Sequence, residues 1–485
     1  MAPLTQLVNI TFKTSTFPQK MKTAVVKALF KNKGTEEDPQ FYRPLSILSV
    51  LSKIFERAAT DQIVQYMEKL NLLFENQHAY RKHHSTSTSL TQLSEYIHKE
   101  MEKGNLVGIA SLDLSKAFDT IDHNILLRKL SELNFNKEAI IWIKSYLTNR
   151  KQRTRFTNHT SEEETVQAGV PQGSILGPIL FIIFTHDFQK ELNQPNIQIT
   201  TYADDTQLIA SGKTYTEIKR KLEEAINEAA NWYTKNSLCI NAGKSEILVI
   251  GTSRKLNKLG KLPNLQVQEG NELKELEVQD HIKILGVYLD KHLNWSKQVD
   301  NVKRKAYLAT KNMLRVKEFL PTEARRKLYD SMITPHFNYC DIVWNGCTKQ
   351  KAQELQRIQN MAAKAIINRK ETSSSQALTE LKLLPLHQKR EIHTAVMVYK
   401  TLQGRAPNPQ IKEIRNRLPQ HHYTTRATTQ NTFIYKKHKN TKNEHSTMYK
   451  ATRVWNKIPV TIKNQDTQET FKNKLQAHYT QQHYT

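Results

Sequence analysis

Three aspartates, Asp113, Asp204 and Asp205, follow or interrupt short apolar segments of the sequence. At about 4 Å and an effective dielectric constant near 20, each pair of like charges costs about 4 kcal/mol, so three clustered carboxylates need a cation nearby. Mg²⁺ takes one or two carboxylates and completes its shell with water and substrate phosphates. Two such ions about 3.5–4 Å apart can activate an attacking hydroxyl and stabilise a leaving pyrophosphate. The chemistry that these residues could support is therefore nucleotidyl transfer.

The elements around the aspartates decide whether they can meet. Residues 106–114 (LVGIASLDL) are short, apolar and partly β-branched, which predicts a buried strand that ends at Asp113. Residues 197–209 (IQITTYADDTQLI) have two apolar halves, which predicts a β-hairpin with Asp204 and Asp205 at its tip. The alternative interpretation of this pair is structural, because Asp is a common turn residue.

Helices are expected to flank these strands. Thr214 followed by Glu217 is the signature of a capping box, and apolar residues then recur at helical spacing as far as Tyr233. The same spacing across residues 51–66, and again around residues 93–97, predicts helices before the strands. Strands flanked by helices in this order are typical of an α+β sheet.

The sequence beyond residue 290 is helical and basic. Residues 296–320 and 349–370 each carry an apolar stripe at helical spacing, with Lys and Arg elsewhere around the helix. Each of these helices can also be read as an ordinary core-packing helix with a solvated polar face. Residues 403–450 are rich in Pro, Thr, His and Lys and poor in apolar residues, so we predict a loose connector there.

The charge of the chain is unevenly distributed. Its 485 residues include 72 Lys and Arg against 46 Asp and Glu, a formal net charge of +26. Residues 1–290 hold 36 basic and 33 acidic side chains, a net of +3, whereas residues 291–485 hold 36 and 13, a net of +23. A surplus of this size indicates a polyanionic partner, most often nucleic acid and less often an anionic membrane. We expect a nearly neutral N-terminal unit followed by a basic one.

Composition excludes several other classes of protein. The only cysteines are Cys239, Cys340 and Cys347, which excludes a disulfide scaffold and indicates a reducing compartment. Cys340 and Cys347 lie near His336, but a fourth ligand at zinc-finger spacing is missing. No segment has the roughly 18 apolar residues of a membrane span, and the N-terminus lacks the features of a signal peptide. We therefore expect an intracellular protein that is neither secreted nor bound to a membrane.

Seven motifs, in order, resemble the reverse transcriptase domain of non-LTR retrotransposons of the LINE type, in particular jockey/CR1-like elements. Two resemble its finger motifs, and the others its first aspartate motif, its template-contact motif, its catalytic hairpin and the two motifs that follow. In chain order they are YRPLSILSVLSKIFE (42–56), QHAYRKHHST (77–86), SLDLSKAFDTIDH (111–123), QAGVPQGSILGPILF (167–181), TYADDTQLI (201–209), INAGKSEILVIG (240–251) and KILGVYLD (283–290).

The resemblance implies a catalytic centre with two Mg²⁺ ions. Asp113 and Asp204 would be direct ligands, together with the main-chain carbonyl of Leu114, and Asp205 would complete the charge of the metal site. Lys244 falls where the family has a lysine that is thought to protonate the leaving pyrophosphate, which is a general-acid role.

The resemblance also implies residues that contact the incoming nucleotide and the template. Phe118 would lie under the sugar and exclude a 2′-hydroxyl, although a Phe at such a position is more often part of an ordinary core. Gln172 would hydrogen-bond the nascent base pair or template. Gly173 would let the main chain approach a ligand closely.

Cations of the finger motifs are expected to hold the triphosphate. Lys53 and Arg81 resemble the residues with this role, since ammonium and guanidinium groups suit phosphate oxygens. Arg43 is a weaker candidate. The alternative for all three is a solvated surface charge.

The fold class implied by the resemblance is α+β, a right-hand polymerase fold with fingers, a palm with an antiparallel sheet and a helical thumb, followed by a basic helical C-terminal extension. We assign fingers and palm to residues 17–290, thumb and basic connector to 291–402, and a basic, partly loose tail to 403–485. The chain starts only about 40 residues before the first finger motif, which leaves no room for the endonuclease of such elements. We therefore expect a partial element product.

The expected function is that of an RNA-directed DNA polymerase. It would transfer nucleotides from deoxynucleoside triphosphates to a primer 3′-hydroxyl on an RNA template. Its partners would be the RNA template and a DNA primer or target, with no evident protein partner, in a nuclear or cytoplasmic ribonucleoprotein. The main alternative is a catalytically inactive, truncated product that only binds nucleic acid. A group II intron maturase or telomerase-like relative would share the palm. It is disfavoured because WNKIP near Trp455 and FKNKLQAHY near the end resemble the tail of LINE-type elements, and because no RNA-binding extension is recognisable at the N-terminus. A membrane-surface protein would leave the catalytic motifs unexplained.

Overall fold

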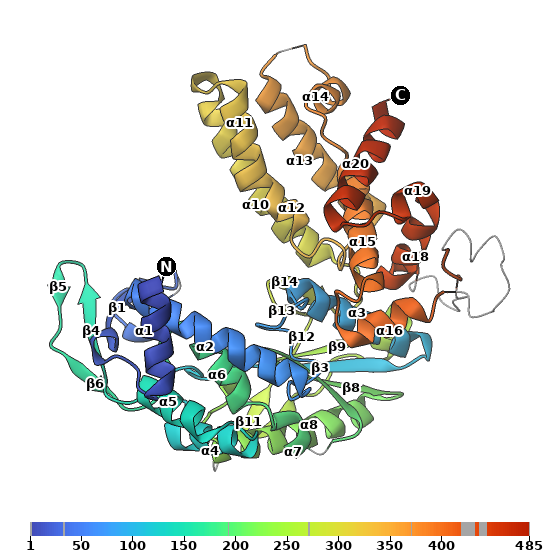
Figure 1. Ribbon diagram of the computed structural model, residues 1–485. Coiled ribbons are helices and arrows are strands. Elements are labelled where there is room, and N and C mark those ends of the chain that lie inside the picture. Colours follow the sequence, from blue (N-terminus) through green and yellow to red (C-terminus); the bar gives the residue numbers. More distant parts are fainter. Residues whose placement is uncertain are drawn as a thin grey trace.

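A five-stranded central sheet lies in the lower half of the molecule in Figure 1, with helices below it and a group of longer helices above it. The structure is a computed structural model that describes residues 2–32, 34–192, 194–269, 272–369, 371–418, 432–435 and 444–484. The strands are β1 (Thr23–Phe30), β2 (Tyr42–Ile47), β3 (Leu106–Leu112), β4 (Arg150–Phe156), β5 (His159–Thr160), β6 (Glu164–Val166), β7 (Ile197–Tyr202), β8 (Asp205–Gly212), β9 (Glu246–Ile250), β10 (Leu265–Glu269), β11 (Glu272–Leu276), β12 (Val278–Gln279), β13 (His281–Ile284) and β14 (Val287–Asp290).

Helices make up most of the remaining chain. Those of the first 290 residues are α1 (Ala2–Lys13), α2 (Val50–Lys69), α3 (Thr86–Glu102), α4 (His123–Glu132), α5 (Lys137–Leu147), α6 (Gly177–Phe184), α7 (Phe188–Glu191), α8 (Tyr215–Lys235) and α9 (Ser253–Leu259). Those that follow are α10 (Ser296–Val316), α11 (Thr322–Leu328), α12 (Thr334–Asn338), α13 (Lys349–Ile367), α14 (Ser374–Glu380), α15 (Leu386–Leu402), α16 (Asn408–Arg415), α18 (Thr447–Lys457), α19 (Val460–Lys463) and α20 (Gln468–Tyr484).

The central sheet confirms the strand and the hairpin that the sequence predicts. Its strand order is β12-β9-β3-β8-β7, and β3 is antiparallel to both of its neighbours. β7 and β8 form a tight hairpin in which Tyr202 pairs with Asp205. Asp113 directly follows β3, and Asp204 lies in the hairpin turn. The register therefore brings all three aspartates to one edge of the sheet, since Leu112 at the end of β3 pairs with Thr206.

Alternate residues of β3 face two different hydrophobic cores, as expected for a strand that is buried on both faces. Leu106 and Ala110 belong to the core beneath the sheet, which includes α6 and α8. Val107 and Ile109 belong to a second core with α3, β13, β14 and the helices that follow. At Gly108 a Cβ atom would lie 2.4 Å from the Ile218 side chain, so glycine lets α8 pack closely on the sheet.

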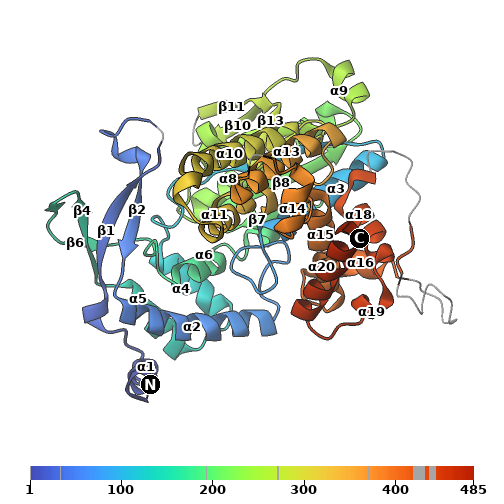
Figure 2. The ribbon, with the colours of Figure 1, turned by 90° about the horizontal axis from the view of Figure 1, so that it is seen from above.

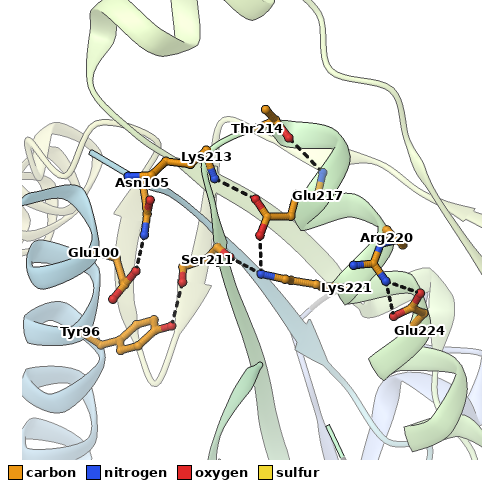
Figure 3. A network of polar contacts seen from close by, with 10 residues as sticks. All are labelled: Tyr96, Glu100, Asn105, Ser211, Lys213, Thr214, Glu217, Arg220, Lys221 and Glu224. Atoms are coloured by element: carbon orange, nitrogen blue, oxygen red, sulfur yellow. Dashed lines mark hydrogen bonds and ion pairs between the residues drawn. The ribbon is translucent and has the colours of Figure 1, made fainter. Parts of the chain in front are cut away.

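A polar network joins the last turns of α3, the end of β8 and the start of α8 (Figure 3). Tyr96 Oη donates to Ser211 Oγ at 3.3 Å, and Lys221 Nζ donates to the Ser211 carbonyl at 2.8 Å. Thr214 caps α8 as predicted, because its hydroxyl accepts the main-chain N–H of Glu217. The reciprocal half of the predicted capping box differs, since Glu217 accepts from the N–H of Lys213, one residue before the cap.

A second, N-terminal sheet stands apart from the central sheet, as Figure 2 shows. Its strand order is β2-β1-β4-β5, and β6 pairs with β4. β1 is antiparallel to β2 but parallel to β4, which joins chain segments more than 120 residues apart. The helices predicted across residues 51–66 and around residues 93–97 are confirmed as α2 and α3.

Helices α10 to α14 form an arm above the central sheet in Figure 1. The predicted apolar stripe of α10 is buried at Val299, Val302, Ala306 and Met313, whereas Val316 at the end of the helix is exposed. The stripe of α13 is likewise buried and includes Leu355, Ile358, Ala362 and Ala365. Lys and Arg side chains cover the other faces of both helices, as the sequence predicts.

Helices α15, α16, α18, α19 and α20 form a C-terminal unit with a hydrophobic core of its own. Trp455 and Phe471 are fully buried in this core, and the Phe471 ring stacks on Tyr399 of α15. Within the segment predicted to be a loose connector, Asn408–Arg415 form α16. Residues 419–431 and 436–443 of that segment lie outside the described residues.

The C-terminal unit is held on α3 by charged side chains. Glu95 of α3 is buried and accepts the main-chain N–H of Met448 at 3.1 Å, while Lys99 forms an ion pair with Glu413 at 2.7 Å. Arg417 also reaches Glu413, at 3.2 Å. Burial raises the pKa of Glu95 to about 7, the hydrogen bond from Met448 and the charge of Arg417 oppose this rise, and Glu413 adds to it. Glu95 is therefore protonated in the folded protein at a pH where it is ionised in the unfolded chain.

We expect Glu95→Gln to stabilise the protein at pH 8. The folded state binds more protons than the unfolded state between the ordinary glutamate pKa and about pH 7, so the stability of the wild type falls as pH rises through this window. Glutamine keeps an acceptor for the Met448 N–H without the cost of burying a charge. The variant should unfold about 2 °C higher than wild type at pH 8 and at the same temperature near pH 4. Thermal unfolding at both pH values measures this, and a wild type that is equally stable at both would contradict it.

Neither a membrane-spanning helix nor a disulfide between Cys340 and Cys347 is present in the described part of the chain. No helix there is long and apolar enough to cross a membrane. Cys340 and Cys347 are buried free thiols. Cys340 Sγ lies 3.6 Å from the Thr86 hydroxyl and Cys347 Sγ lies 4.0 Å from an Arg390 nitrogen.

Candidate active site

Asp113 is positioned by the segment between α8 and β9. Its main-chain carbonyl accepts the N–H of Asn241 at 2.8 Å, and its own N–H donates to the Ser245 hydroxyl at 3.3 Å. Leu114 is bridged to Ile240 through hydrogen bonds of the flanking residues, and neither bond uses the Leu114 carbonyl. The carboxylate of Asp113 and the carbonyl of Leu114 are thus held next to each other at the end of β3, where the sequence predicts two oxygen ligands.

The electrostatics show that the three carboxylates lie close together. Burial raises the pKa of Asp204, and the charge of Asp113 raises it further. The pKa of Asp205 is raised to about 6 by partial burial and by the charges of Asp204 and Asp113. Each shift means that negative charge is crowded at this edge of the central sheet and favours proton or cation binding.

Two cations offset part of this charge. Lys244, at the end of the short helix η3 (Ala242–Lys244), places Nζ 3.7 Å from Asp113 Oδ2. The Lys244 side chain is 64% exposed, so this ion pair contributes little to stability but leaves the ammonium group free to reach a substrate. Arg43 of β2 is the cation that lowers the pKa of Asp204. Of the finger cations considered from the sequence, Arg43 is therefore the one whose charge acts on the aspartates.

The chemistry of the donor set fits a hard divalent cation. Asp113, Asp204, Asp205 and the Leu114 carbonyl offer only oxygen atoms, and their excess negative charge is only partly balanced. Within the described ranges, no three His, Cys, Asp or Glu side chains are arranged as a ready-made metal site. The protein oxygens thus match an ion that takes few carboxylates and completes its shell with water and substrate phosphates, as Mg²⁺ does.

The predicted template-contact turn packs against the segment that follows Asp113. Gln172 Nε2 donates to both carboxylate oxygens of Asp119, at 2.9 and 2.8 Å. The Gln172 carbonyl accepts the N–H of Ser46 at 2.8 Å, which joins the turn to β2. Gly173 has a positive φ of 111°, and a Cβ atom there would lie 2.8 Å from the Ser46 carbonyl oxygen. Only glycine therefore fits where this turn meets β2.

Glu56 is an anchor of the same turn that the sequence analysis did not single out. It is fully buried in α2, and its Oε2 accepts the N–H groups of Ile175 and Leu176 at 2.7 and 3.4 Å. Its Oε1 accepts the Ser52 hydroxyl at 2.6 Å. The signal available in the sequence was a glutamate next to Phe55, on the side of the helix that also carries Ala59 and Ile63, and a buried carboxylate needs several donors. Asp119, which holds Gln172, was also missed.

Phe118 belongs to the aspartate motif and contacts the template-contact motif. Its carbonyl accepts the N–H of Val170 at 2.8 Å, and its ring contacts the Phe181 ring with a centroid separation of 4.9 Å. The Phe118 side chain is only partly buried, so part of the ring remains open. This position combines core packing with an exposed edge beside the Gln172 turn.

The other two finger cations are not brought to the aspartates by any contact in the described residues. Arg81 Nη1 donates to the main-chain carbonyls of Phe74 and Gln77, at 2.6 and 3.3 Å, and so ties together the loop between α2 and α3. Lys53 is exposed on α2. Their role in holding a triphosphate stays a prediction.

Comparisons with known proteins agree with the motif order. Residues 30–289 match the family described as "Reverse transcriptase (RNA-dependent DNA polymerase)". The "Probable RNA-directed DNA polymerase from transposon BS" of Drosophila melanogaster is 30% identical over 75% of this chain and 40% of that protein. The "RNA-directed DNA polymerase from mobile element jockey" of the same species is 26% identical over 73% of this chain and 39% of that protein. The chain thus spans about two fifths of the length of these curated relatives.

Among solved structures, this chain is similar to apo telomerase from Candida tropicalis. The match has a TM-score of 0.43 and 11% sequence identity, and it covers 76% of this chain and 63% of that chain.

Proposed function

Because the chain belongs to the reverse transcriptase family, we propose that it is an RNA-directed DNA polymerase of the non-LTR retrotransposon type. It would add deoxynucleotides to a primer 3′-hydroxyl on an RNA template. The observation that carries this proposal is that Asp113, directly after β3, and Asp204, in the turn before the neighbouring strand β8, lie close together at an edge of the sheet where negative charge is crowded.

Asp113, Asp204 and the Leu114 carbonyl would hold divalent metal, and Asp205 would support the charge. When bound, Mg²⁺ would supply positive charge to the attacking hydroxyl and to the leaving pyrophosphate. Lys244 can approach the same pyrophosphate as a proton donor, since its ammonium group is exposed within 3.7 Å of Asp113. Gln172, fixed by Asp119, would orient the template base.

The elements divide naturally among the parts of a right-hand polymerase. In this proposal the N-terminal sheet with α2 forms the fingers, the central sheet with α6 and α8 forms the palm, and α10 to α14 form the thumb. The basic faces of α10 and α13 would grip the backbone of a template–primer duplex without reading its sequence. The protein would act inside the cell, in a nuclear or cytoplasmic ribonucleoprotein.

Primer extension tests the proposed function. Purified protein would be incubated with an RNA template, an annealed DNA primer, deoxynucleoside triphosphates and Mg²⁺, and the products separated by length. Extension that requires Mg²⁺ supports the proposal. Binding of the template–primer without any extension would instead support the alternative of a catalytically inactive, truncated product.

We expect Phe118→Val to weaken discrimination against ribonucleotides. Loss of the ring would open the space beneath the sugar, so incorporation of ribonucleotides relative to deoxynucleotides should rise by about 100-fold. Single-nucleotide incorporation with each kind of triphosphate measures this ratio. Phe118→Tyr is the matched control, because it keeps the ring and should keep the discrimination. A Val variant that rejects ribonucleotides as well as wild type would show that Phe118 acts only in packing against Phe181.

A further inference from the structure

A cleft with a volume of about 820 Å³ lies between the start of α3 and the C-terminal unit. We call it the α3–α15 cleft. The loop of residues 82–85 and the first turns of α3 form one wall, and α15 and the start of α16 form the other. Asn338, at the end of α12, and residues 340–342 also line it. α3, α15 and α16 lie close together in both overall views (Figures 1 and 2).

The lining of the α3–α15 cleft is basic. Lys82, Lys400 and Arg405 contribute to it, and none of them forms an ion pair within the described part of the chain. The single acidic residue in the lining is Asp341, which is paired with His393 at 2.7 Å. Burial and the charges of Lys82, Arg405 and Lys400 lower the pKa of His83, whereas the charge of Glu68, which does not line the cleft, raises it. The cations that act on this space therefore outnumber the carboxylates.

The walls also contain buried polar atoms that need a partner. Thr91 is 1% exposed and Gln410 is 7% exposed, and both line the cleft. Neither the Thr91 hydroxyl nor the Gln410 side-chain oxygen has a hydrogen-bond partner among the described residues. Buried polar groups are almost always paired with protein, water or ligand. Each wall thus contains a buried polar atom whose hydrogen-bonding capacity the described residues leave unused.

The α3–α15 cleft adjoins the strand that carries the catalytic turn. Thr86 at the start of α3 contacts Cys340, which lines the cleft. Burial and the nearby Cys340 raise the pKa of Tyr202, which lies two residues before Asp204. A chain of neighbouring groups therefore leads from the candidate active site to the wall of the cleft.

We propose that the α3–α15 cleft is a second nucleic-acid site, which binds the phosphodiester backbone of a single strand outside the polymerase centre. Lys82, Lys400 and Arg405 supply charge for phosphates, and the hydroxyl and amide groups of the walls supply hydrogen bonds. The cleft is bounded by two walls, which suits one strand better than a duplex. The choice of nucleic acid as the occupant rests on the proposed polymerase function.

The test removes the three cations together, in the full chain. Lys82→Gln, Lys400→Gln and Arg405→Gln would be combined, and binding to a single-stranded RNA and to a DNA of the same sequence would be measured by fluorescence anisotropy over a range of salt concentrations. Affinity for at least one of the strands should fall about tenfold. Each lost phosphate contact lowers the log–log salt slope by about 0.7 for single strands, so the slope should fall by about 2.

A matched control variant shows whether binding depends on the cations of the cleft or only on the total charge of the C-terminal unit. Lys412→Gln, Arg415→Gln and Lys474→Gln remove three exposed cations from the same C-terminal unit but outside the cleft lining. Binding by this variant should remain within about twofold of wild type. Equal losses in both variants, or no loss in the cleft variant, would overturn the proposal. A loss with RNA alone would show that the cleft reads the 2′-hydroxyl, and a loss with both strands that it reads only the backbone.

A primer-extension assay distinguishes failure of the cleft proposal from failure of the proposed polymerase function. Extension of a hairpin template–primer with a short overhang should stay within about twofold of wild type in the cleft variant, because that substrate needs only the polymerase centre. A parallel loss of short-hairpin extension would place the three cations in the polymerase centre and overturn a second site. Failure of the wild-type protein to extend any primer would reject the polymerase while leaving the strand-binding measurement decisive for the cleft.

Discussion

Asp204→Asn should lower the rate of primer extension by about 10³-fold or more, with the central sheet still folded. Asparagine has the size of aspartate but lacks the negative charge, so the hairpin turn should keep its shape, while the proposed metal site would lose a carboxylate that supports the transition state. The rate of a single deoxynucleotide addition, at saturating Mg²⁺ and substrate, is the quantity to measure. A variant that retains more than a tenth of the wild-type rate would show that the chemistry does not depend on this turn.

Stability provides an independent readout of the same substitution. Because the pKa of Asp204 is raised in the folded protein, its ionised form disfavours folding, and this cost grows as pH rises above the ordinary aspartate pKa. In the absence of divalent metal, Asp204→Asn should therefore be at least as stable as wild type at pH 7. Asp61→Asn is the matched control, because Asp61 is an exposed aspartate of α2 whose ion pair is with Arg57 of the same helix. It should leave extension within about twofold of wild type.

Local patterns in the sequence were enough to predict the elements that carry the aspartates. The strand that ends at Asp113 and the hairpin around Asp204 are confirmed, because each is a short apolar segment bounded by turn residues. The helices α2, α3, α8, α10 and α13 are confirmed for a similar reason, since apolar residues recur in them at helical spacing. In α2 this spacing does not identify the buried face, because Leu51 and Ile54 are exposed. These signals depend only on neighbours in the sequence.

Contacts between distant segments could not be predicted in the same way. The parallel pairing of β1 with β4 carries no local signal, and neither does the hydrogen bond from Gln172 to Asp119. The sequence analysis did not predict the hydrophobic core of the C-terminal unit. That core depends on a few large side chains, such as Trp455 and Phe471, within a sequence that is poor in apolar residues overall. Composition reports the average of a segment, whereas packing depends on which residues meet.

Glu56 makes one such contact between distant segments, since it joins α2 to the turn before α6. Glu56→Ala should destabilise the protein by about 3 kcal/mol. The substitution leaves the N–H groups of Ile175 and Leu176 and the hydroxyl of Ser52 without their acceptor in a buried place. Extension should fall as well, because these amides belong to the turn that presents Gln172. Urea unfolding measures the first effect, and hydrogen exchange at the amides of residues 175 and 176 reports directly on the turn.

Two further variants separate loss of the anchor from loss of charge. Glu56→Gln keeps an acceptor oxygen for the turn and should cost about 1 kcal/mol, with little change in exchange at residue 175. Glu68→Ala removes an exposed carboxylate from the same helix and should change stability by less than about 0.5 kcal/mol. If the amides of residues 175 and 176 exchange no faster in Glu56→Ala than in wild type, Glu56 does not hold the turn. In that case the hydrogen bonds of Gln172 with Asp119 and with Ser46 of β2 are enough to keep it in place.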